Sequence, residues 1–273
     1  MGQLFDPASA LPAARRAVDL AVHLLRTSRP GTLTSKGDRD MASEMDYAVE
    51  RALRQYLRDE TPHIGFHGEE DGGTDLASQT SWILDPVDGT ANFVHGIPLC
   101  AVSLGLVHNG HPVLGVIAMP YLGERYWAVR GHGAFDESGR LSVPGTRRLP
   151  DAIVALGDYA VGTGADHENR LRIALTDRLA ANVQRIRMVG SAAIDLVWLA
   201  AGRFDACVAL SNKPWDTAAG VVLAAEAGAL VVDADGSPHG LDSTATIAAN
   251  PALIPALTGL VSAARESLAT VRG

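Results

Sequence analysis

The 273-residue sequence predicts an α/β protein built in two halves, with helices packed on an antiparallel sheet in residues 1–150 and an α/β arrangement in residues 151–273. Three observations predict this class. Apolar residues recur at helical spacing before residue 60, β-rich runs separated by glycine turns follow, and short strands alternate with helical stretches after Pro150. A chain of this length can bury a substantial core.

The first half opens with two amphipathic helices. In the first helix, apolar residues recur at Leu11, Ala14, Val18, Ala21 and Leu25. Pro30 and the glycine after it close this segment, and a polar turn at residues 34–40 follows. Ser43 and Asp46 then have the spacing of a capping box at the start of the second helix. The capping role is therefore the plain structural interpretation of Asp46.

The central feature of the first half is a buried strand that runs into two acids. Apolar residues 82–84 lead into Asp85, and Asp88-Gly89 is a strong turn signal. Both carboxylates on one tight turn can hold hard cations, and the amides of Gly89 and Thr90 can meet a phosphate oxygen. The alternative is an ordinary Asp-Gly hairpin turn that carries a second, solvated aspartate.

The remaining elements follow from β-rich runs and helical periodicity. In the first half, hairpin strands are expected at residues 99–106, 113–118 and 126–129. In the second half, strands are expected at residues 153–156, 183–188, 206–210, 230–232 and 246–248. Helices are expected at residues 171–181, 193–201, 217–227 and 252–271. The alternation of strands with helices predicts that the sheet of the second half is more parallel than the sheet of the first half.

Three further acids each have a plain structural alternative. Glu69 and Glu70 follow a short strand at residues 64–66, and adjacent glutamates on a loop are usually solvated. Asp216 precedes a helix rich in small residues, where an aspartate is commonly an N-cap. A cap is compatible with metal binding, so both interpretations stay open.

Composition narrows the function classes. The net charge of −8 and the pI of about 5.5 argue against a protein that grips nucleic-acid backbone, and an anionic substrate would need bound cations. Cys100 and Cys207 lie far apart in apolar surroundings, which predicts buried free thiols. No segment has the pattern of a leader or a membrane span, so we expect a cytoplasmic protein without a membrane partner.

Taken together, separated blocks of the sequence resemble the signature of the inositol monophosphatase family, which consists of magnesium-dependent, lithium-sensitive phosphatases. The blocks are Lys36, Asp40, Asp46, residues 68–70, residues 85–92 with their continuation to residue 98, and residues 214–220. The resemblance extends from about Lys36 to Asp233, and the order of the blocks makes it more specific than any single block. It implies a layered αβαβα sandwich, commonly a homodimer.

The resemblance also implies a role for each matching residue. It implies metal ligation by Glu69, Asp85, the backbone carbonyl of Val87, Asp88 and Asp216. Glu70 matches an acid behind the ligands, Gly89 and Thr90 match a phosphate-binding turn, and Asp46 with Thr90 matches the pair that orients and deprotonates water. The implied cofactor is Mg²⁺, as two or three ions. Hydrolysis of a phosphate ester by metal-activated water, without a covalent intermediate, is the expected reaction.

The substrate is less sharply indicated. The turn that holds Ser191 and Ala192 resembles the family's turn on the substrate side of the site. Arg187 and residues 211–213 are candidate substrate contacts, although their plainer interpretation is as surface loop residues. Inositol 1-phosphate is the first expectation because it is the family's commonest substrate. Ala209 stands where members that act on inositol phosphate often place a glutamate. Histidinol phosphate, fructose 1,6-bisphosphate and 3′-phosphoadenosine 5′-phosphate therefore remain alternatives.

Two other classes of function compete with this interpretation. Phosphatases with an Asp-x-Asp-Gly-Thr loop form an aspartyl-phosphate, but here two residues separate Asp85 from Asp88 and the loop lies deep in the chain. A non-catalytic protein that binds metal or phosphate could keep the same fold. Every position that matches a side-chain metal ligand carries an acid, so the sequence shows no loss of catalytic function.

Overall fold

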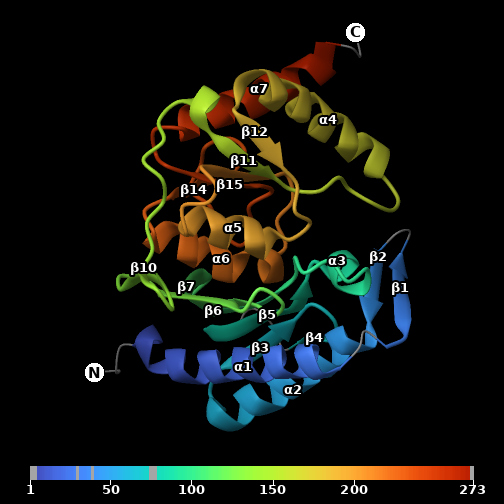
Figure 1. Cartoon of the computed structure of the whole chain (residues 1–273), viewed down its shortest axis with the longest axis vertical. Coiled ribbons are helices and arrows are strands. Elements are labelled where there is room, and N and C mark those ends of the chain that lie inside the picture. The colour runs from blue at the N-terminus through green and yellow to red at the C-terminus, as the bar shows by residue number, and fades with distance from the viewer. Residues whose placement is uncertain (1–4, 29–30, 38–39, 74–78, 271–273) are drawn as a thin grey trace.

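The computed structural model describes residues 5–28, 31–37, 40–73 and 79–270, with the side chains of residues 35–42 and 270 outside the description. Its elements form five layers, helix, sheet, helix, sheet and helix (Figure 1). The layered αβαβα sandwich expected from the resemblance is confirmed. The predicted boundary near residue 150 falls between the last strand of the first sheet and the first strand of the second.

The first sheet has eight strands in the order β10-β9-β8-β7-β6-β5-β3-β4. Its strands are β3 (Gly65–Gly68), β4 (Gly72–Gly73), β5 (Thr80–Asp88), β6 (Ala101–His108), β7 (His111–Met119), β8 (Glu124–Val129), β9 (Gly133–Asp136) and β10 (Gly139–Arg140). Neighbouring strands are antiparallel except β3 and β5, which run parallel. This parallel pair positions part of the site.

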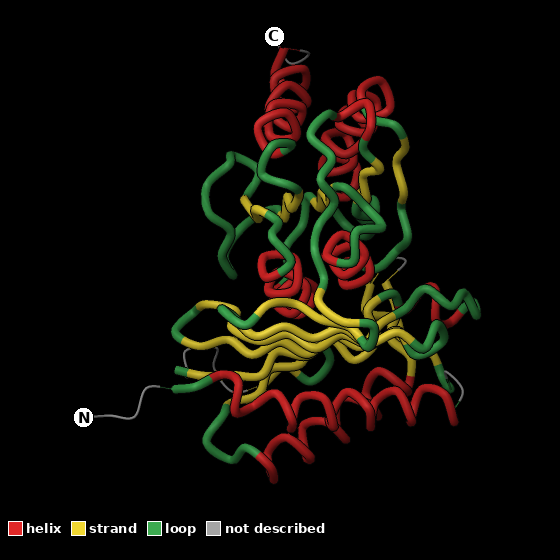
Figure 2. Tube along the Cα trace, turned by 60° about the vertical axis from the view of Figure 1, so that its left-hand side comes forward, coloured by secondary structure: helices red, strands yellow, loops and turns green. Residues whose placement is uncertain are grey.

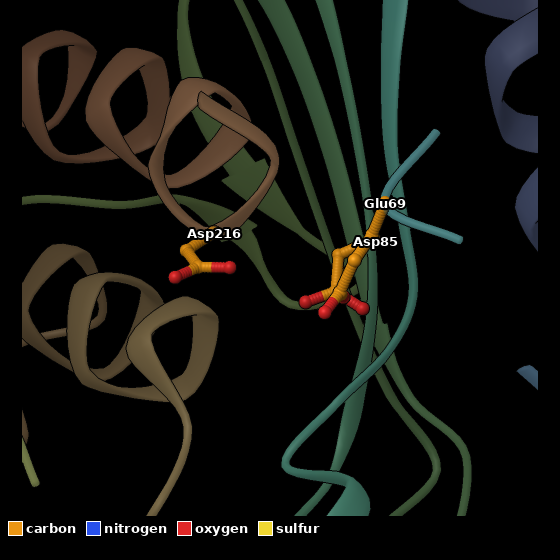
Figure 3. Close-up of side chains that lie close together, drawn as sticks. All are labelled: Glu69, Asp85 and Asp216. Atoms are coloured by element: carbon orange, nitrogen blue, oxygen red, sulfur yellow. The ribbon is translucent and has the colours of Figure 1, made fainter. Parts of the chain in front are cut away.

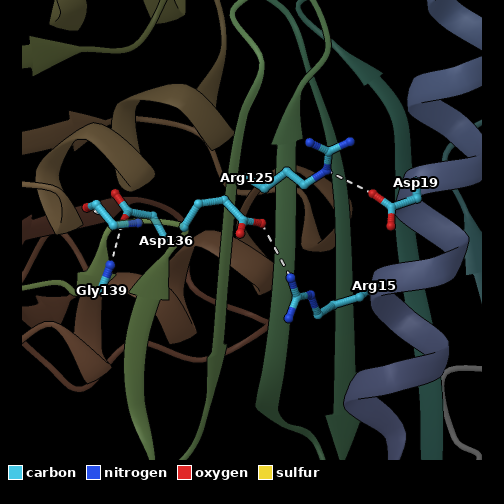
Figure 4. Close-up of polar contacts among 7 residues, drawn as sticks. Arg15, Asp19, Arg125, Asp136 and Gly139 are labelled. Carbon is cyan, nitrogen blue, oxygen red and sulfur yellow. Dashed lines mark hydrogen bonds and ion pairs between the residues drawn. The ribbon is translucent and has the colours of Figure 1, made fainter.

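Two long helices cover the outer face of the first sheet. They are α1 (Leu11–Thr27), which follows the short helix η1 (Pro7–Ala10), and α2 (Glu44–Glu60). The predicted apolar positions of α1 are buried or half-buried against the sheet. Arg125 on β8 donates to Asp19 at 2.8 Å, and Arg15 reaches Glu137 at 3.4 Å (Figure 4). Because the side chains of both ion pairs are exposed, these pairs add little to the stability of the protein.

The second sheet has five strands in the order β12-β11-β13-β15-β14. Its strands are β11 (Ile153–Leu156), which follows η2 (Leu149–Asp151), β12 (Arg185–Arg187), β13 (Ala206–Ala209), β14 (Leu230–Val232) and β15 (Thr246–Ala249). β11 pairs in parallel with β12 and β13, whereas β15 runs antiparallel to β13 and β14. The sheet is therefore mixed and less parallel than the sequence predicted.

The remaining long helices lie on the two faces of this second sheet. α4 (Ala165–Asn182) and α7 (Ile254–Thr270) cover its outer face, while α5 (Ala192–Ala200) and α6 (Pro214–Glu226) lie between the sheets (Figure 2). Gly115 on β7 allows α6 to approach closely, because a Cβ there would overlap the backbone of Ala219. One apolar cluster thus joins α5 and α6 to the first sheet. The division into two domains, residues 1–150 and 151–273, stays a prediction.

The structure departs from the sequence analysis at two points near the site. The polar turn predicted at residues 34–40 is a hairpin, β1 (Leu33–Gly37) and β2 (Asp40–Ser43), in which residues 38–39 lie outside the described residues. The side chains of Lys36 and Asp40, which belong to the resemblance, also lie outside the description. The central strand does not end at Asp85 but continues through a bulge to Asp88.

Two remaining expectations concern the thiols and the membrane. Cys100 and Cys207 are buried free thiols, as predicted. Burial raises the pKa of Cys100 to about 12, so its thiol is protonated and unreactive at neutral pH. Within the described residues, every helix is too short or too polar to cross a membrane.

Candidate metal centre

Three carboxylates from three different elements meet at one point. Glu69 follows β3, Asp85 lies on β5, and Asp216 lies in the first turn of α6 (Figure 3). This helix packs on the face of the first sheet that is opposite to α1 and α2. One oxygen from each carboxylate lies within 4.8 Å of the others. The parallel pairing of β3 with β5 brings the first two acids together, and the Glu69 amide donates to the carbonyl of Leu84 at 3.1 Å. Oxygen-only ligands at this spacing suit a hard divalent cation.

A bulge in β5 shapes the next part of the site. The amide of Val87 donates to Asp85 Oδ1 at 2.9 Å, which fixes that carboxylate. Gly89 then adopts a left-handed conformation with φ of 89°, and a Cβ there would lie 2.9 Å from the carbonyl of Leu99. Only glycine fits this turn, which leads directly into the short helix α3 (Thr90–Val94).

Burial and neighbouring negative charges raise the pKa values of two acids of the site. Burial raises the pKa of Asp85 well above its ordinary value, and the neighbouring carboxylates Glu69 and Asp88 raise it further. Burial also raises the pKa of Asp88 to about 6, although hydrogen bonds from Ser191 and the backbone partly oppose this shift. Like charges brought together in a buried site are stabilised by a bound cation. The donor set therefore fits a divalent metal ion.

Asp88 is anchored at the start of α5. Its Oδ2 accepts from Ser191 Oγ and from the Ala193 amide, both at 2.6 Å, and the Ala192 amide also lowers the pKa of its carboxyl. Ser191 is the N-cap of α5 and accepts from the Ile194 amide at 3.2 Å. The predicted substrate-side turn thus holds one of the predicted metal ligands in place.

The carboxylate of Asp46 accepts hydrogen bonds from two neighbouring residues. Its Oδ2 accepts from the Ser43 amide at 2.9 Å, and the predicted capping box of α2 is present. Its Oδ1 accepts from Thr90 Oγ1 at 3.1 Å, and the same hydroxyl lies 3.0 Å from the carbonyl of Val87. Asp46 is only 1% exposed. The cap fixes the carboxylate, and Oδ1 faces the hydroxyl of Thr90.

Asp216 is not the N-cap of its helix. α6 begins at Pro214 with Lys213 at the N-cap position, and Asp216 lies in the first turn. The sequence alternative for this residue was therefore wrong. A carboxylate in the first turn still gains from the helix dipole, and its side chain points toward the other two acids (Figure 3).

Sequence analysis missed Glu50, which holds the loop that carries Glu69 and Glu70. Glu50 is fully buried on α2, and its carboxylate accepts from the amides of Glu70 at 2.8 Å and Asp71 at 3.0 Å. Arg54 pairs with the same carboxylate at 2.5 Å. The spacing of Glu50 and Arg54 on a helix suggests only a surface ion pair, so no local signal marks this contact.

Replacing Glu50 with glutamine is expected to weaken metal binding. The amide group of glutamine turns a donor toward partners that are themselves donors, so the loop after β3 loses part of its support and Glu69 its fixed position. We expect the magnesium Kd to rise about tenfold, which calorimetric titration measures. Glu60→Gln, an exposed position on the same helix, is the matched control. Unchanged affinity in Glu50→Gln would show that the loop is held by other contacts.

A cavity of about 400 Å³ opens beside Asp88 and Asp216. Ser191, Ala192 and Ala209 line it, as do Ser211 and Lys213. Two other residues that were predicted as substrate contacts bond to the backbone instead. Arg187 lies outside this lining, is exposed and donates to the carbonyl of Ile186, while the side chain of Asn212 is bonded to the backbone of residues 240–243.

Comparisons with known proteins agree with this geometry. A family model described as the inositol monophosphatase family matches residues 7–268. An inositol-1-monophosphatase of Mesorhizobium japonicum is 40% identical over 223 residues, which cover 81% of this chain and 83% of the relative. A Thermotoga maritima protein named fructose-1,6-bisphosphatase/inositol-1-monophosphatase is 36% identical, with 73% and 74% covered. A solved Thermotoga maritima IMPase structure matches with a TM-score of 0.87 at 30% identity, covering 95% of this chain and 99% of the other.

Proposed function

Because the chain belongs to the inositol monophosphatase family, we propose that it hydrolyses a small phosphate monoester with the help of magnesium. The observation that supports this best is the position of the Thr90–Asp46 pair beside the three-carboxylate cluster. The pair supplies a hydroxyl and a fixed carboxylate, and the cluster supplies a place for cations. Together they are the parts needed to activate water against a phosphate ester.

Glu69, Asp85 and Asp216 would hold the metal, with Asp88 and the carbonyl of Val87 as further oxygen ligands. When bound, magnesium neutralises the charge of the phosphate and lowers the pKa of a coordinated water. Oxygen ligands in this number favour magnesium, and two or three ions are proposed. Glu70 is proposed to lie behind these ligands as an auxiliary acid.

The chain's own residues have distinct tasks in the proposed reaction. The Thr90 hydroxyl positions the attacking water and passes a proton toward Asp46 Oδ1, which lies 3.1 Å away. The amides of Gly89 and Thr90 are proposed to bind the phosphate oxygens at the turn before α3. The capping box keeps Asp46 from turning away as the proton moves.

The names of the relatives support inositol 1-phosphate as the reference substrate for this proposal. The double name of the Thermotoga maritima relative also keeps fructose 1,6-bisphosphate in view. Histidinol phosphate and 3′-phosphoadenosine 5′-phosphate stay alternatives because Ala209 leaves that wall of the cavity small and apolar. Inhibition by lithium, a homodimer and a cytoplasmic location are proposed on the same family ground.

A phosphate-release assay tests the proposal directly. The four esters are incubated with the protein and magnesium, with a chelator, and with added lithium. We expect magnesium-dependent release from at least one ester, abolished by the chelator and reduced by lithium. Absence of release from every ester would favour a non-catalytic binding protein, and a trapped phosphorylated aspartate would favour the aspartyl-phosphate mechanism.

A further inference from the structure

One buried carboxylate in the cavity is not used by the proposed metal site. Asp195 lies in the first turn of α5, is 2% exposed and forms part of the cavity wall next to Asp88. Among the described residues, its Oδ1 has no hydrogen-bond partner. Leaving a buried carboxylate oxygen without a donor is costly, and a ligand that enters the cavity with a donor would remove this cost.

A second acid lines the same cavity. Asp158 follows β11 and lines the cavity, and its Oδ2 lies 3.5 Å from the place where a Cβ on Gly190 would be. Two independent segments, a loop of the second sheet and a helix between the sheets, thus aim carboxylates at one volume.

The cations in the cavity wall do not neutralise these two acids. Arg172 is paired with Glu168 at 2.9 Å and also donates to the carbonyl of Leu210. Lys213 lies with its Nζ 5.7 Å from the centroid of the Trp215 ring. Within the described part of the chain, neither Asp158 nor Asp195 forms an ion pair. This end of the cavity therefore favours a positively charged group.

The rest of this end of the cavity is apolar and partly fixed. Tyr159, Ala160, Val161 and Ala209 contribute to the lining. The Tyr159 hydroxyl bonds to Thr176 Oγ1 at 3.1 Å, which holds the ring at the edge of the cavity. A leaving group with a carbon skeleton and one cationic group matches this combination of apolar walls and two acids.

We propose that Asp195, assisted by Asp158, binds a protonated amine on the alcohol part of the substrate. The inference rests on the proposed phosphatase function and specifies its substrate class as phosphate esters of amino alcohols. An ammonium group donates charge-assisted hydrogen bonds, which are about twice as strong as the neutral bonds that a hydroxyl offers. The protein should therefore bind an amine ester measurably more tightly than a polyol ester such as inositol 1-phosphate.

Asp195 could instead serve only the fold. A carboxylate in the first turn of α5 stabilises the helix through its dipole, whatever the substrate is. A purely structural role would change the hydrolysis of all esters to the same extent. A binding role changes only the esters that carry an amine.

The test uses pairs of esters that differ by one group. Glucosamine 6-phosphate is compared with glucose 6-phosphate, and histidinol phosphate with its analogue that has a hydroxyl in place of the amine. In the presence of magnesium, we expect the kcat/KM of the amine ester to be at least tenfold higher than that of its hydroxyl counterpart in at least one pair. Equal or lower kcat/KM for the amine in both pairs would overturn the inference, while the proposed phosphatase function would stand.

Asp195→Asn, which keeps the shape of the side chain, should raise the KM of the preferred amine ester about tenfold or more and change kcat less than about threefold. Its hydroxyl counterpart should be unaffected. The matched control is Asp177→Asn, an exposed position on α4 with the same loss of charge. Equal effects on both esters of a pair would assign Asp195 a structural role and overturn the inference. Should this variant not fold, Asp158→Asn is expected to raise the same KM about threefold.

A binding measurement tests this inference independently of the proposed phosphatase activity. The same pairs are titrated calorimetrically into Thr90→Ala with magnesium, where turnover is slow. Tighter binding of the amine supports the subsite even if the wild-type protein releases no phosphate. Equal affinities would overturn it, whatever the activity.

Discussion

Asp85→Asn is expected to abolish metal binding and to lower phosphate release by at least about a thousandfold. Asp85 is 2% exposed and has an oxygen within 4.8 Å of oxygens of Glu69 and Asp216, so the amide replaces the most buried of the proposed carboxylate ligands with a neutral group. Asparagine keeps an oxygen that can accept from the Val87 amide, and the bulge of β5 should survive. Calorimetric titration with magnesium measures the first effect, and a phosphate-release assay measures the second.

The same substitution is expected to stabilise the metal-free protein at neutral pH. The folded-state pKa values of Asp85 and Asp88 are raised, the latter to about 6, so the folded state binds more protons than the unfolded state above about pH 4. Stability of the metal-free wild type therefore falls as the pH rises from about 4 toward 7. Asp85→Asn removes part of this penalty, with an expected gain of about 1–3 kcal/mol at pH 7.5 that disappears near pH 4.

Urea unfolding in the presence of a chelator, repeated across this pH range, measures the gain. Asp177→Asn is the control because it removes one exposed carboxylate far from any metal ligand. A variant that is less stable than wild type at pH 7.5 would show that Asp85 serves the fold rather than the metal. Full retention of metal affinity would contradict the ligand assignment itself.

The central strand shows how much the sequence can predict. Apolar residues followed by Asp85, Asp88 and Gly89 are local signals, because side-chain chemistry and the left-handed turn are written within a few positions. Placement of strands and helices in the second half was correct for the same reason, since periodicity is local. The capping box at Ser43 and Asp46 is likewise a short-range pattern that the structure confirms.

Contacts between distant segments could not be predicted in this way. Glu50 meets the loop after β3 across about twenty residues, and Asp216 reaches the cluster from a different layer of the sandwich. Asp195 carries no signal in the sequence, and only the packing of α5 against the cavity shows that its Oδ1 is buried without a donor. The hairpin at residues 33–43 was missed because polar strands lack the alternation that marks a half-buried strand.

Thr90→Ala is expected to lower kcat about a hundredfold to a thousandfold while the magnesium Kd changes less than about threefold. In the proposed reaction the hydroxyl links the attacking water to Asp46 Oδ1, and its removal leaves the three carboxylates of the cluster untouched. Alanine is a good helix former at the start of α3, so the fold should be kept. Steady-state kinetics with calorimetric titration of magnesium separates the two effects.

Thr90→Ser restores the hydroxyl and is expected to recover kcat to within about tenfold of wild type. Asp46→Asn should match the loss seen in Thr90→Ala, and the double variant should be no slower than either single one, because the two groups pass the same proton. Additive losses would mean that the hydroxyl and the carboxylate act on different steps. In that case Thr90 would not pass its proton to Asp46, and the acceptor of that proton would have to be sought elsewhere among the acids of the cluster.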